Sequence, residues 1–327
     1  MITDTRGRIV EFIRVNGRAR VNDLVEYLEI GNVAIHRQLK RLVESKVLAK
    51  TGTPPRVFYL LREKQEKPES KQAGAAEKLV EKTYLYVTPA GEMLSGMRGF
   101  EMWAARVKRE IKSAAAEYAK SRKKADEFIG KNGWIDATEK LNRTFKDDTY
   151  VDKVLYKDFY ALPVFGKTRL GQLVLYGKQA QSKQIVKQVA AECQGLIKRI
   201  ISRFGIQAVG FLPHSIPRRI QFLKELRKNL KLNLPEVELV KVYAGMIPVA
   251  QKSLASLEER VENARRTIMI GDIGPRFTSV LLIDDAVGSG ATLNETAKKL
   301  KLSGMAKKVI GFAIVGSMKG FEVIREV

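Results

Sequence analysis

Two adjacent carboxylates and a glycine-rich turn near the carboxyl end are the residues of this sequence whose spacing best fits a chemical task. Asp284 and Asp285 directly follow the apolar run Val280–Ile283, and Gly288-Ser289-Gly290-Ala291-Thr292 comes two residues later. Glycines let backbone N–H groups close around a phosphate, and a helix that begins there adds the positive end of its dipole. The Ser and Thr hydroxyls can donate to the phosphate, and the carboxylates can accept hydrogen bonds from ribose hydroxyls. The pattern predicts a site for a sugar phosphate.

A buried strand and the helix after it must position these groups. The apolar run predicts the strand, and a helix is expected from Leu293 to about Ser303. After Gly205, strand-sized apolar runs alternate with helical segments, which is typical of a parallel α/β sheet. Such sheets bind ligands at the carboxyl ends of their strands. We therefore expect an α/β domain with its site at that edge of the sheet.

The stretch from Val280 to Thr292 resembles the 5-phosphoribosyl 1-pyrophosphate (PRPP) motif of type I phosphoribosyltransferases. It departs from the motif at Gly288-Ser289, where two Thr or Ser are commonest, so one hydroxyl contact is lost while the backbone cradle remains. The resemblance implies that Asp284 and Asp285 contact the ribose, and that Mg²⁺ arrives with PRPP and meets them only indirectly. It also implies PRPP contacts from the turn residues Gly288, Ser289, Gly290, Ala291 and Thr292.

A second segment extends the resemblance. The predicted strand Ala208–Leu212 runs into Pro213-His214-Ser215-Ile216-Pro217-Arg218-Arg219. In the family, the loop at this position grips pyrophosphate with its backbone amides, which implies PRPP contacts from Pro213, His214, Ser215 and Arg218. For His214, a role in capping the loop stays open.

A third segment is similar to the competence-protein-F group of this family. Within Pro248–Arg265, the residues Gln251, Leu254, Arg260 and Asn263 follow that group's spacing. Enzymes of the fold carry a mobile loop there that covers the site, and Arg260 would stabilise the leaving pyrophosphate. The zinc ribbon that often opens such chains has no counterpart here, and the resemblance spans about residues 205–327.

The amino-terminal 62 residues predict a different module. Ile9, Phe12 and Ile13 share one side of a helix that Asn16-Gly17 ends, and a second helix is expected to begin with Asn22 as its cap. A third helix starts near Asn32 with Ile35, Leu39 and Leu42 facing inward. Two strand-like pieces follow, Val47–Lys50 and Arg56–Leu61, around Thr51–Pro55.

This order resembles the winged helix-turn-helix family of bacterial and archaeal regulators. In that family the third helix enters the major groove and the hairpin wing touches the backbone of double-stranded DNA. The resemblance implies that Asn32, His36, Arg37 and Lys40 face bases and phosphates, and that Lys50 and Arg56 reach the backbone. A module used for protein contacts stays open, as does a solvent-facing His36 without a special task. Residues 1–62 hold twelve Lys and Arg against six Asp and Glu, a balance of +6.

Between the two modules we expect a charged linker over residues 63–82 and a helical connecting or dimerisation region over 83–157. A helix is expected from Glu101 to about Ile129, with Trp103, Val107, Ile111 and Ala115 at helical spacing as a core seam or dimer interface. Lys120–Lys124 is either a nucleic-acid contact or a solvated face. Gln172–Tyr176 reads as a strand and Gln181–Phe204 as one long helix. The phosphoribosyltransferase-like domain then covers 158–327, with its core at 205–327.

Charge and composition bound the function classes. The 327 residues hold 59 Lys and Arg against 36 Asp and Glu, a net charge of +23, which favours polyanionic partners. A Lys-rich proteome would give the same balance. Cys193 is the only cysteine and is expected to pack as a small apolar residue; with only His36 and His214 to join it, no structural zinc is expected. The apolar runs are too short for a membrane helix and no signal peptide is recognised, so a cytoplasmic protein is expected.

Two function classes follow, with a third left open. A DNA-binding transcriptional regulator would use the α/β domain as a sensor of PRPP or a nucleotide, a layout that resembles the purine-operon repressors. An active phosphoribosyltransferase would transfer ribose 5-phosphate from PRPP to a nitrogenous base, with Asp284, Asp285 and Arg260 as its catalytic residues. A competence or DNA-processing factor is the third. A homodimer is the expected assembly because DNA sites with two-fold symmetry match it.

Overall fold

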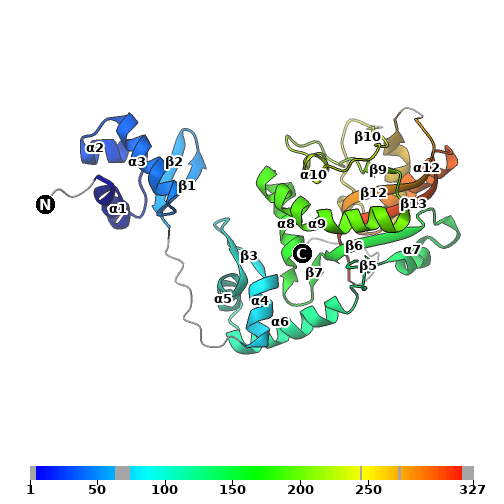
Figure 1. The fold of residues 1–327 in the computed structure, drawn as a ribbon, viewed down its shortest axis with the longest axis horizontal. Coiled ribbons are helices and arrows are strands. Elements are labelled where there is room, and N and C mark those ends of the chain that lie inside the picture. The colour runs from blue at the N-terminus through cyan, green and yellow to red at the C-terminus, as the bar shows by residue number, and fades with distance from the viewer. Residues whose placement is uncertain (1–4, 63–73, 244, 272–273, 319–327) are drawn as a thin grey trace. The chain divides into compact units, whose positions relative to one another are not determined.

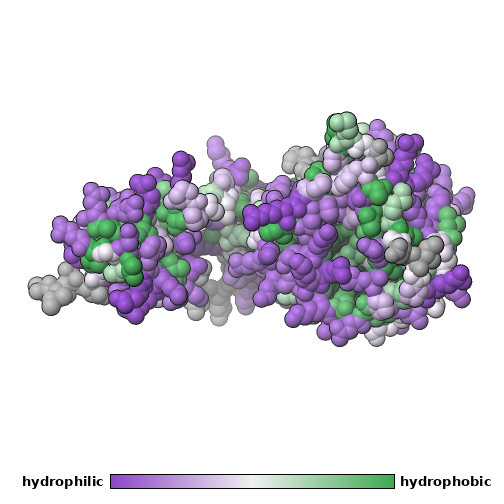
Figure 2. All heavy atoms as spheres, turned by 90° about the horizontal axis from the view of Figure 1, so that it is seen from above, coloured by the Kyte–Doolittle hydropathy of each residue, from purple (hydrophilic) through white to green (hydrophobic). Residues whose placement is uncertain are grey.

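The computed structural model describes residues 5–62, 74–243, 245–271 and 274–318. The chain divides into two compact units, unit 1 (Met1–Lys71) and unit 2 (Gln72–Val327). Each unit has its own hydrophobic core. Hydrophilic side chains dominate the face drawn in Figure 2, with hydrophobic ones scattered among them.

Unit 1 has the predicted order of elements: α1 (Thr5–Asn16), α2 (Val21–Leu28), α3 (Asn32–Glu44), β1 (Leu48–Thr53) and β2 (Arg56–Leu61). The predicted inward residues Ile9, Ile13, Ile35 and Leu39 are fully buried. The two strands form an antiparallel hairpin, and Ala19 pairs with Tyr59 to add a third short piece. Because this pairing fixes the α1–α2 connection, the cap of α2 differs from the prediction: Arg20 is its N-cap, and the backbone N of Arg20 donates to Asp23 at 2.8 Å.

Unit 2 is built on a five-stranded sheet in the order β5-β6-β13-β12-β9 (Figure 1). Its strands are β5 (Ile135–Asp136), β6 (Lys153–Phe159), β9 (Ala208–Phe211), β12 (Phe277–Val287) and β13 (Ala306–Gly316). All neighbours pair in parallel except β5 and β6. The central strands β12 and β13 are apolar on both faces, as a parallel sheet covered by helices requires. The α/β expectation is confirmed.

The helices around the sheet form two groups. The helix α9 (Lys183–Phe204) packs along α8 (Arg169–Gln179) and α10 (Phe222–Leu230), whereas α11 (Leu257–Thr267) packs on α12 (Ala291–Leu302). The prediction of one long helix at 181–204 is confirmed, and Cys193 is buried in it. A small antiparallel pair, β10 (Leu239–Lys241) with β11 (Ile268–Ile270), flanks α11. The remaining short elements near the sheet are α7 (Thr138–Phe145), η1 (Lys146–Asp148), β7 (Ala161–Leu162), β8 (Gly166–Lys167) and η2 (Gln251–Ser253).

A separate group of elements in unit 2 consists of α4 (Ala75–Thr83), α5 (Gly96–Arg106), α6 (Ile111–Asp126) and the hairpin β3 (Leu85–Val87) with β4 (Met93–Ser95) (Figure 1). Its core is aromatic, with Tyr84, Phe100, Trp103, Tyr118 and Phe165 in mutual ring contact.

Two predicted boundaries shift in unit 2. Residues 63–73 of the expected linker lie outside the described residues. The rest of that segment forms most of α4, because Val80 is fully buried against the core. The expected boundary at residue 157 falls inside β6. Val154, Leu155 and Tyr156 are buried in the central sheet, so this strand belongs to the α/β domain and not to a connecting region.

Two element predictions were also wrong. The helix expected over 101–129 breaks after Arg106, since Lys108 takes a left-handed φ of 55° and Glu110 caps α6 by accepting from two backbone N–H groups. Val107 and Ile111 are exposed as a result and form no core seam. The expected strand Gln172–Tyr176 lies within α8, which Thr168 caps by accepting from Gly171 N at 3.0 Å.

Candidate functional site

The predicted phosphate cradle lies where β12 meets α12. β12 is buried through Ile283, and Asp284 and Asp285 follow half-buried. Gly290 is the N-cap of α12, with a φ of 75° in the left-handed region that favours glycine. Ser289 is buried, and its Oγ accepts from Ala291 N at 3.4 Å. The first turn of an α-helix has N–H groups without intrahelical partners, so this end of α12 can hold an anion.

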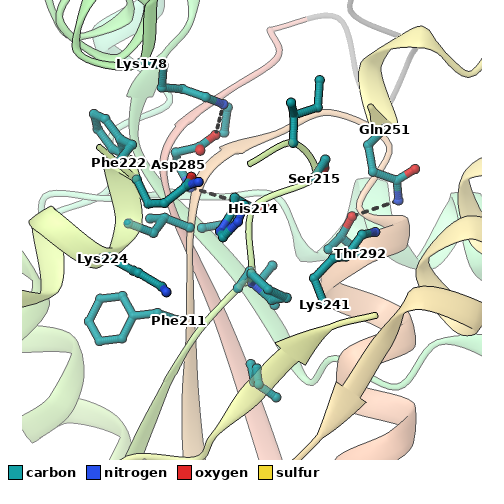
Figure 3. Close-up of a pocket in the computed structure, with 18 of the residues that line it drawn as sticks. Lys178, Phe211, His214, Ser215, Phe222, Lys224, Lys241, Gln251, Asp285 and Thr292 are labelled. Carbon is teal, nitrogen blue, oxygen red and sulfur yellow. Dashed lines mark hydrogen bonds and ion pairs between the residues drawn. The ribbon is translucent and has the colours of Figure 1, made fainter. Parts of the chain in front are cut away.

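A cavity of about 880 Å³ opens in front of the cradle (Figure 3). Its size fits a nucleotide-sized ligand. The predicted PRPP contacts line it with one exception: Ala291 is buried behind the turn and is not in the wall. The structure thus brings together residues from three separate segments, namely Asp284, Asp285, Gly288, Ser289, Gly290 and Thr292 from the motif, Pro213, His214, Ser215 and Arg218 from the loop after β9, and Arg260 from α11.

A lysine that the sequence analysis did not single out lies against the acid pair. Lys178 of α8 points toward Asp285 in Figure 3, with 2.9 Å between Lys178 Nζ and Asp285 Oδ1. Burial and the charge of Asp285 raise the pKa of Asp284 to about 7, opposed by the Lys178 ammonium. Burial lowers the pKa of Lys178, but the two carboxylates outweigh it and raise that pKa overall. The protonation states of Lys178, Asp284 and Asp285 therefore depend on one another.

A second basic region lies on the β10 side of the cavity. Burial, together with the charges of Lys224 and Lys241, lowers the pKa of His214 and favours its neutral form. Lys241 is half-buried, and burial lowers its pKa to about 8. Its Nζ donates to Asn263 Oδ1 at 3.1 Å and to the Thr267 hydroxyl, both of α11. A half-buried ammonium whose partners among the described residues are neutral oxygens favours an anionic ligand.

Arg260 is buried in the cavity wall, and its guanidinium is already engaged. Its Nε and Nη2 donate to the Leu254 carbonyl oxygen at 3.1 and 3.0 Å. The predicted contact with a leaving pyrophosphate would require it to give up these bonds. The Gln251 amide N donates to the Arg260 carbonyl and to Thr292 Oγ1, both at 3.0 Å, and the second bond is drawn in Figure 3. Thr292 accepts this bond, so its own proton remains available for a phosphate oxygen.

Aromatic and apolar side chains form another part of the wall. Tyr160, Phe211, Phe222 and Tyr243 line the cavity, together with Leu212. Flat rings and apolar surface are suited to pack against a heterocyclic base. The cavity therefore combines an anion cradle, an acid pair and an apolar wall.

The site residues that sequence reasoning missed are Lys178 and Lys241. Lys178 belongs to a helix whose sequence reads as a strand, and no local spacing links it to an acid pair more than 100 residues later. Lys241 ends a short strand, and no local spacing singles it out; its place in the cavity wall becomes visible only through its contacts with α11. Their roles depend on tertiary contacts.

In unit 1, the predicted DNA-contact residues of α3 are all exposed: Asn32, His36, Arg37 and Lys40. The two predicted wing residues, Lys50 and Arg56, are exposed as well. Lys50 lies opposite the core residue Tyr59, and Arg56 lies opposite Thr53, which is three positions after Lys50 on the same strand. Because successive residues of a strand point to opposite faces, Lys50 and Arg56 lie on opposite faces of the hairpin.

Within the described ranges, no group of three or more His, Cys, Asp or Glu side chains could hold a metal ion. Within the same ranges, every helix is too short or too polar to cross a bilayer.

Comparison with known proteins finds only distant likeness. No family model and no curated protein matches the sequence. Among solved structures, a hypoxanthine phosphoribosyltransferase from Staphylococcus aureus is 16% identical, with a TM-score of 0.25 over 45% of this chain and 71% of its own. An adenine phosphoribosyltransferase from Leishmania tarentolae is 15% identical, with a TM-score of 0.25 over 48% and 78%. One from Trypanosoma brucei, solved with AMP, pyrophosphate and ribose-5-phosphate, is 12% identical, with a TM-score of 0.24 over 54% and 79%. Likeness of this size establishes no family, so function has to rest on the chain's own residues.

Proposed function

We propose that unit 2 binds the ribose 5-phosphate group of PRPP or of a nucleotide, and that unit 1 binds double-stranded DNA. The protein would then be a regulator whose DNA binding responds to that ligand. The observation that carries the ligand proposal is the phosphate cradle at the start of α12, which shares one cavity with the acid pair Asp284 and Asp285.

Each part of the ligand has a matching group in the cavity. The helix end, the glycines and the Thr292 hydroxyl would hold the 5-phosphate. Asp284 and Asp285 would accept from the ribose hydroxyls, Lys241 would face the same 5-phosphate, and the loop after β9 would face any further phosphate groups. Mg²⁺ would arrive with the pyrophosphate of PRPP. The aromatic wall would contact the base when the ligand is a nucleotide.

The DNA proposal is supported by the order of elements in unit 1 and by the exposed cations of α3. It resembles the winged helix-turn-helix family in its three helices followed by a hairpin, and residues 1–62 carry a net charge of +6. Arg37 and Lys40 are exposed on the helix that this family inserts into the major groove. A homodimer would present two such helices to a two-fold site.

Calorimetry of the whole chain with Mg²⁺-PRPP, ribose 5-phosphate and AMP tests the ligand proposal. We expect binding by the wild type and a loss of at least about tenfold in Asp284→Asn, because a charged hydrogen-bond acceptor is removed. Asp147→Asn, an exposed acid outside the cavity, is the matched control. A wild type that binds none of the three ligands would sink the proposal.

Fluorescence anisotropy with duplex DNA at several salt concentrations tests the DNA proposal. Arg37→Ala should weaken binding and lower the slope of log affinity against log salt by about one, as expected for one lost phosphate contact. Arg14→Ala, an exposed cation on α1, should change little. The regulator proposal further requires that the ligand shift DNA affinity at fixed salt. If DNA and ligand bind independently, the sensor role is wrong.

An active phosphoribosyltransferase is the second candidate. Both carboxylates lie in the cavity beside a wall that fits a base, which favours transfer chemistry. The engagement of Arg260 with the Leu254 carbonyl counts against its assistance to a leaving group. Release of pyrophosphate from PRPP with any of a panel of nitrogenous bases, abolished in Asp284→Asn, would establish the enzyme. Tight PRPP binding without release would leave the sensor.

A further inference from the structure

The acid pair of the cavity has a cation supplied by the chain. Lys178 Nζ lies 2.9 Å from Asp285 Oδ1, and its charge also acts on Asp284. The lysine belongs to α8, so the ammonium reaches the pair from a different segment than the motif. An ammonium has three donors, and one is used on Asp285. The other two can donate to ligand oxygens.

Contacts with the segment 218–222 hold this end of α8 in place. The backbone carbonyl of Lys178 accepts from Arg218 Nη1 at 2.7 Å, and Gln181 Oε1 accepts from Ile220 N at 3.0 Å. A side chain at Gly177 would come within 2.9 Å of the Phe222 ring, so α8 lies close against α10. The position of Lys178 is thus set by the same loop that forms the cavity wall.

A resident divalent ion does not fit the acid pair in this arrangement. Mg²⁺ requires near-octahedral oxygen ligands at about 2.0–2.1 Å. The Asp285 carboxylate instead faces an ammonium, and within the described ranges no third acid, His or Cys completes a ligand group. Two cations cannot share the pair without strong repulsion.

We propose that Lys178 is the permanent counter-cation of Asp284 and Asp285, so that a ribose phosphate binds at the pair without a divalent metal. This inference rests on the proposed ligand function of unit 2. Lys178 offsets the repulsion between the two carboxylates, keeps both positioned as acceptors for ribose hydroxyls, and donates to the ligand oxygen nearest to it. Any Mg²⁺ requirement would then belong to a pyrophosphate group and not to the ribose phosphate.

Calorimetry of the full chain with ribose 5-phosphate, which lacks pyrophosphate, tests this in EDTA and in Mg²⁺. The wild type should bind with affinities that agree within about threefold, since metal adds little where an ammonium already lies. Lys178→Met should lose at least about tenfold in EDTA and regain part of that loss in Mg²⁺. Lys178→Arg, which keeps the charge, should remain largely independent of metal.

Lys224→Met is the matched control, because Lys224 is an exposed cation of the same cavity. Its affinity should change by the same factor in EDTA and in Mg²⁺. Thermal unfolding checks that each variant is folded. The comparison of wild-type affinity in EDTA and in Mg²⁺ tests the inference without any substitution. Wild-type binding that depends on Mg²⁺, or a Lys178→Met affinity equal to wild type in EDTA, overturns the inference while the ligand function stands. A wild type that binds under neither condition overturns both.

Discussion

Raising the pH through 8 is expected to weaken the binding of a phosphate ligand in unit 2, because Lys241 loses its charge there. Burial lowers its pKa to about 8, and its described partners are the neutral oxygens of Asn263 and Thr267. A bound phosphate would favour the charged form and raise this pKa again, so binding takes up a proton. The contribution of Lys241 to affinity is therefore present below pH 8 and lost above it.

The size of the expected loss of affinity follows from the pKa of about 8 for Lys241. Between pH 7.5 and 9.5 the charged fraction of free Lys241 falls from about three quarters to about 3%. If only the charged form binds phosphate, affinity falls roughly 25-fold, or about 1.9 kcal/mol at 1.36 kcal/mol per pKa unit. A phosphate monoester loses its second proton near pH 6 and keeps a constant charge in this window. The pKa of about 7 for Asp284 lies below the window, so the acid pair contributes little to the slope.

Calorimetry with ribose 5-phosphate across this pH range provides the measurement. Repeating it in buffers of different ionisation enthalpy gives the number of protons taken up, which should approach one near pH 9. Lys241→Met should bind more weakly at pH 7.5 and lose the pH dependence. Lys224→Met, which removes an exposed cation, should keep it. A wild-type affinity that is flat from pH 7.5 to 9.5, or a Lys241→Met slope equal to the wild-type slope, would refute the reasoning.

Two further changes test the structure that supports the cavity. Arg122→Met should lower the free energy of unfolding by about 3 kcal/mol in urea denaturation, because it leaves the half-buried Asp158 without the buried guanidinium that now donates to both its oxygens. Arg143→Met, which removes an exposed ion pair on α7, should cost less than about 1 kcal/mol; equal costs would contradict the reasoning. Gly171→Ala should lower both the melting temperature and the affinity for ribose 5-phosphate. A Cβ there would lie 2.0 Å from the Tyr160 carbonyl oxygen, and relief of that clash must shift the helix that carries Lys178. Unchanged affinity would show that the position of α8 does not matter for the ligand.

The parts of the fold that sequence predicts correctly depend on local spacing. In unit 1, Ile9 and Ile13 repeat at helical spacing, and Asn16-Gly17 ends α1 where expected. The strand, turn and helix within Val280–Leu302 are local too, since they follow one another along the chain. Each of these elements depends on neighbours within a few residues, so the residue types alone are enough to predict it.

Errors arose where distant contacts or a single backbone angle decide the outcome. The helical spacing of Trp103, Val107 and Ile111 continues across a break that Lys108 makes with a left-handed φ. The segment Gln172–Tyr176 is apolar enough for a strand, and only its packing within α8 decides for a helix. β6 joins the α/β domain because it pairs with β13, about 150 residues later. None of these three features can be predicted from the residue types of the neighbouring positions.

The acid pair shows what this difference means for function. The motif around Asp284 is visible in the sequence, and by resemblance it implies that Mg²⁺ accompanies the ligand. The cation that actually faces the pair comes from α8, and its position depends on a carbonyl contact with Arg218. Under the role proposed for Lys178, two chains with the same local motif would differ in their need for metal, according to whether a lysine reaches the acids from elsewhere in the fold. The motif would then predict which ligand is bound, and the charges that distant elements add would decide under which ionic conditions it binds.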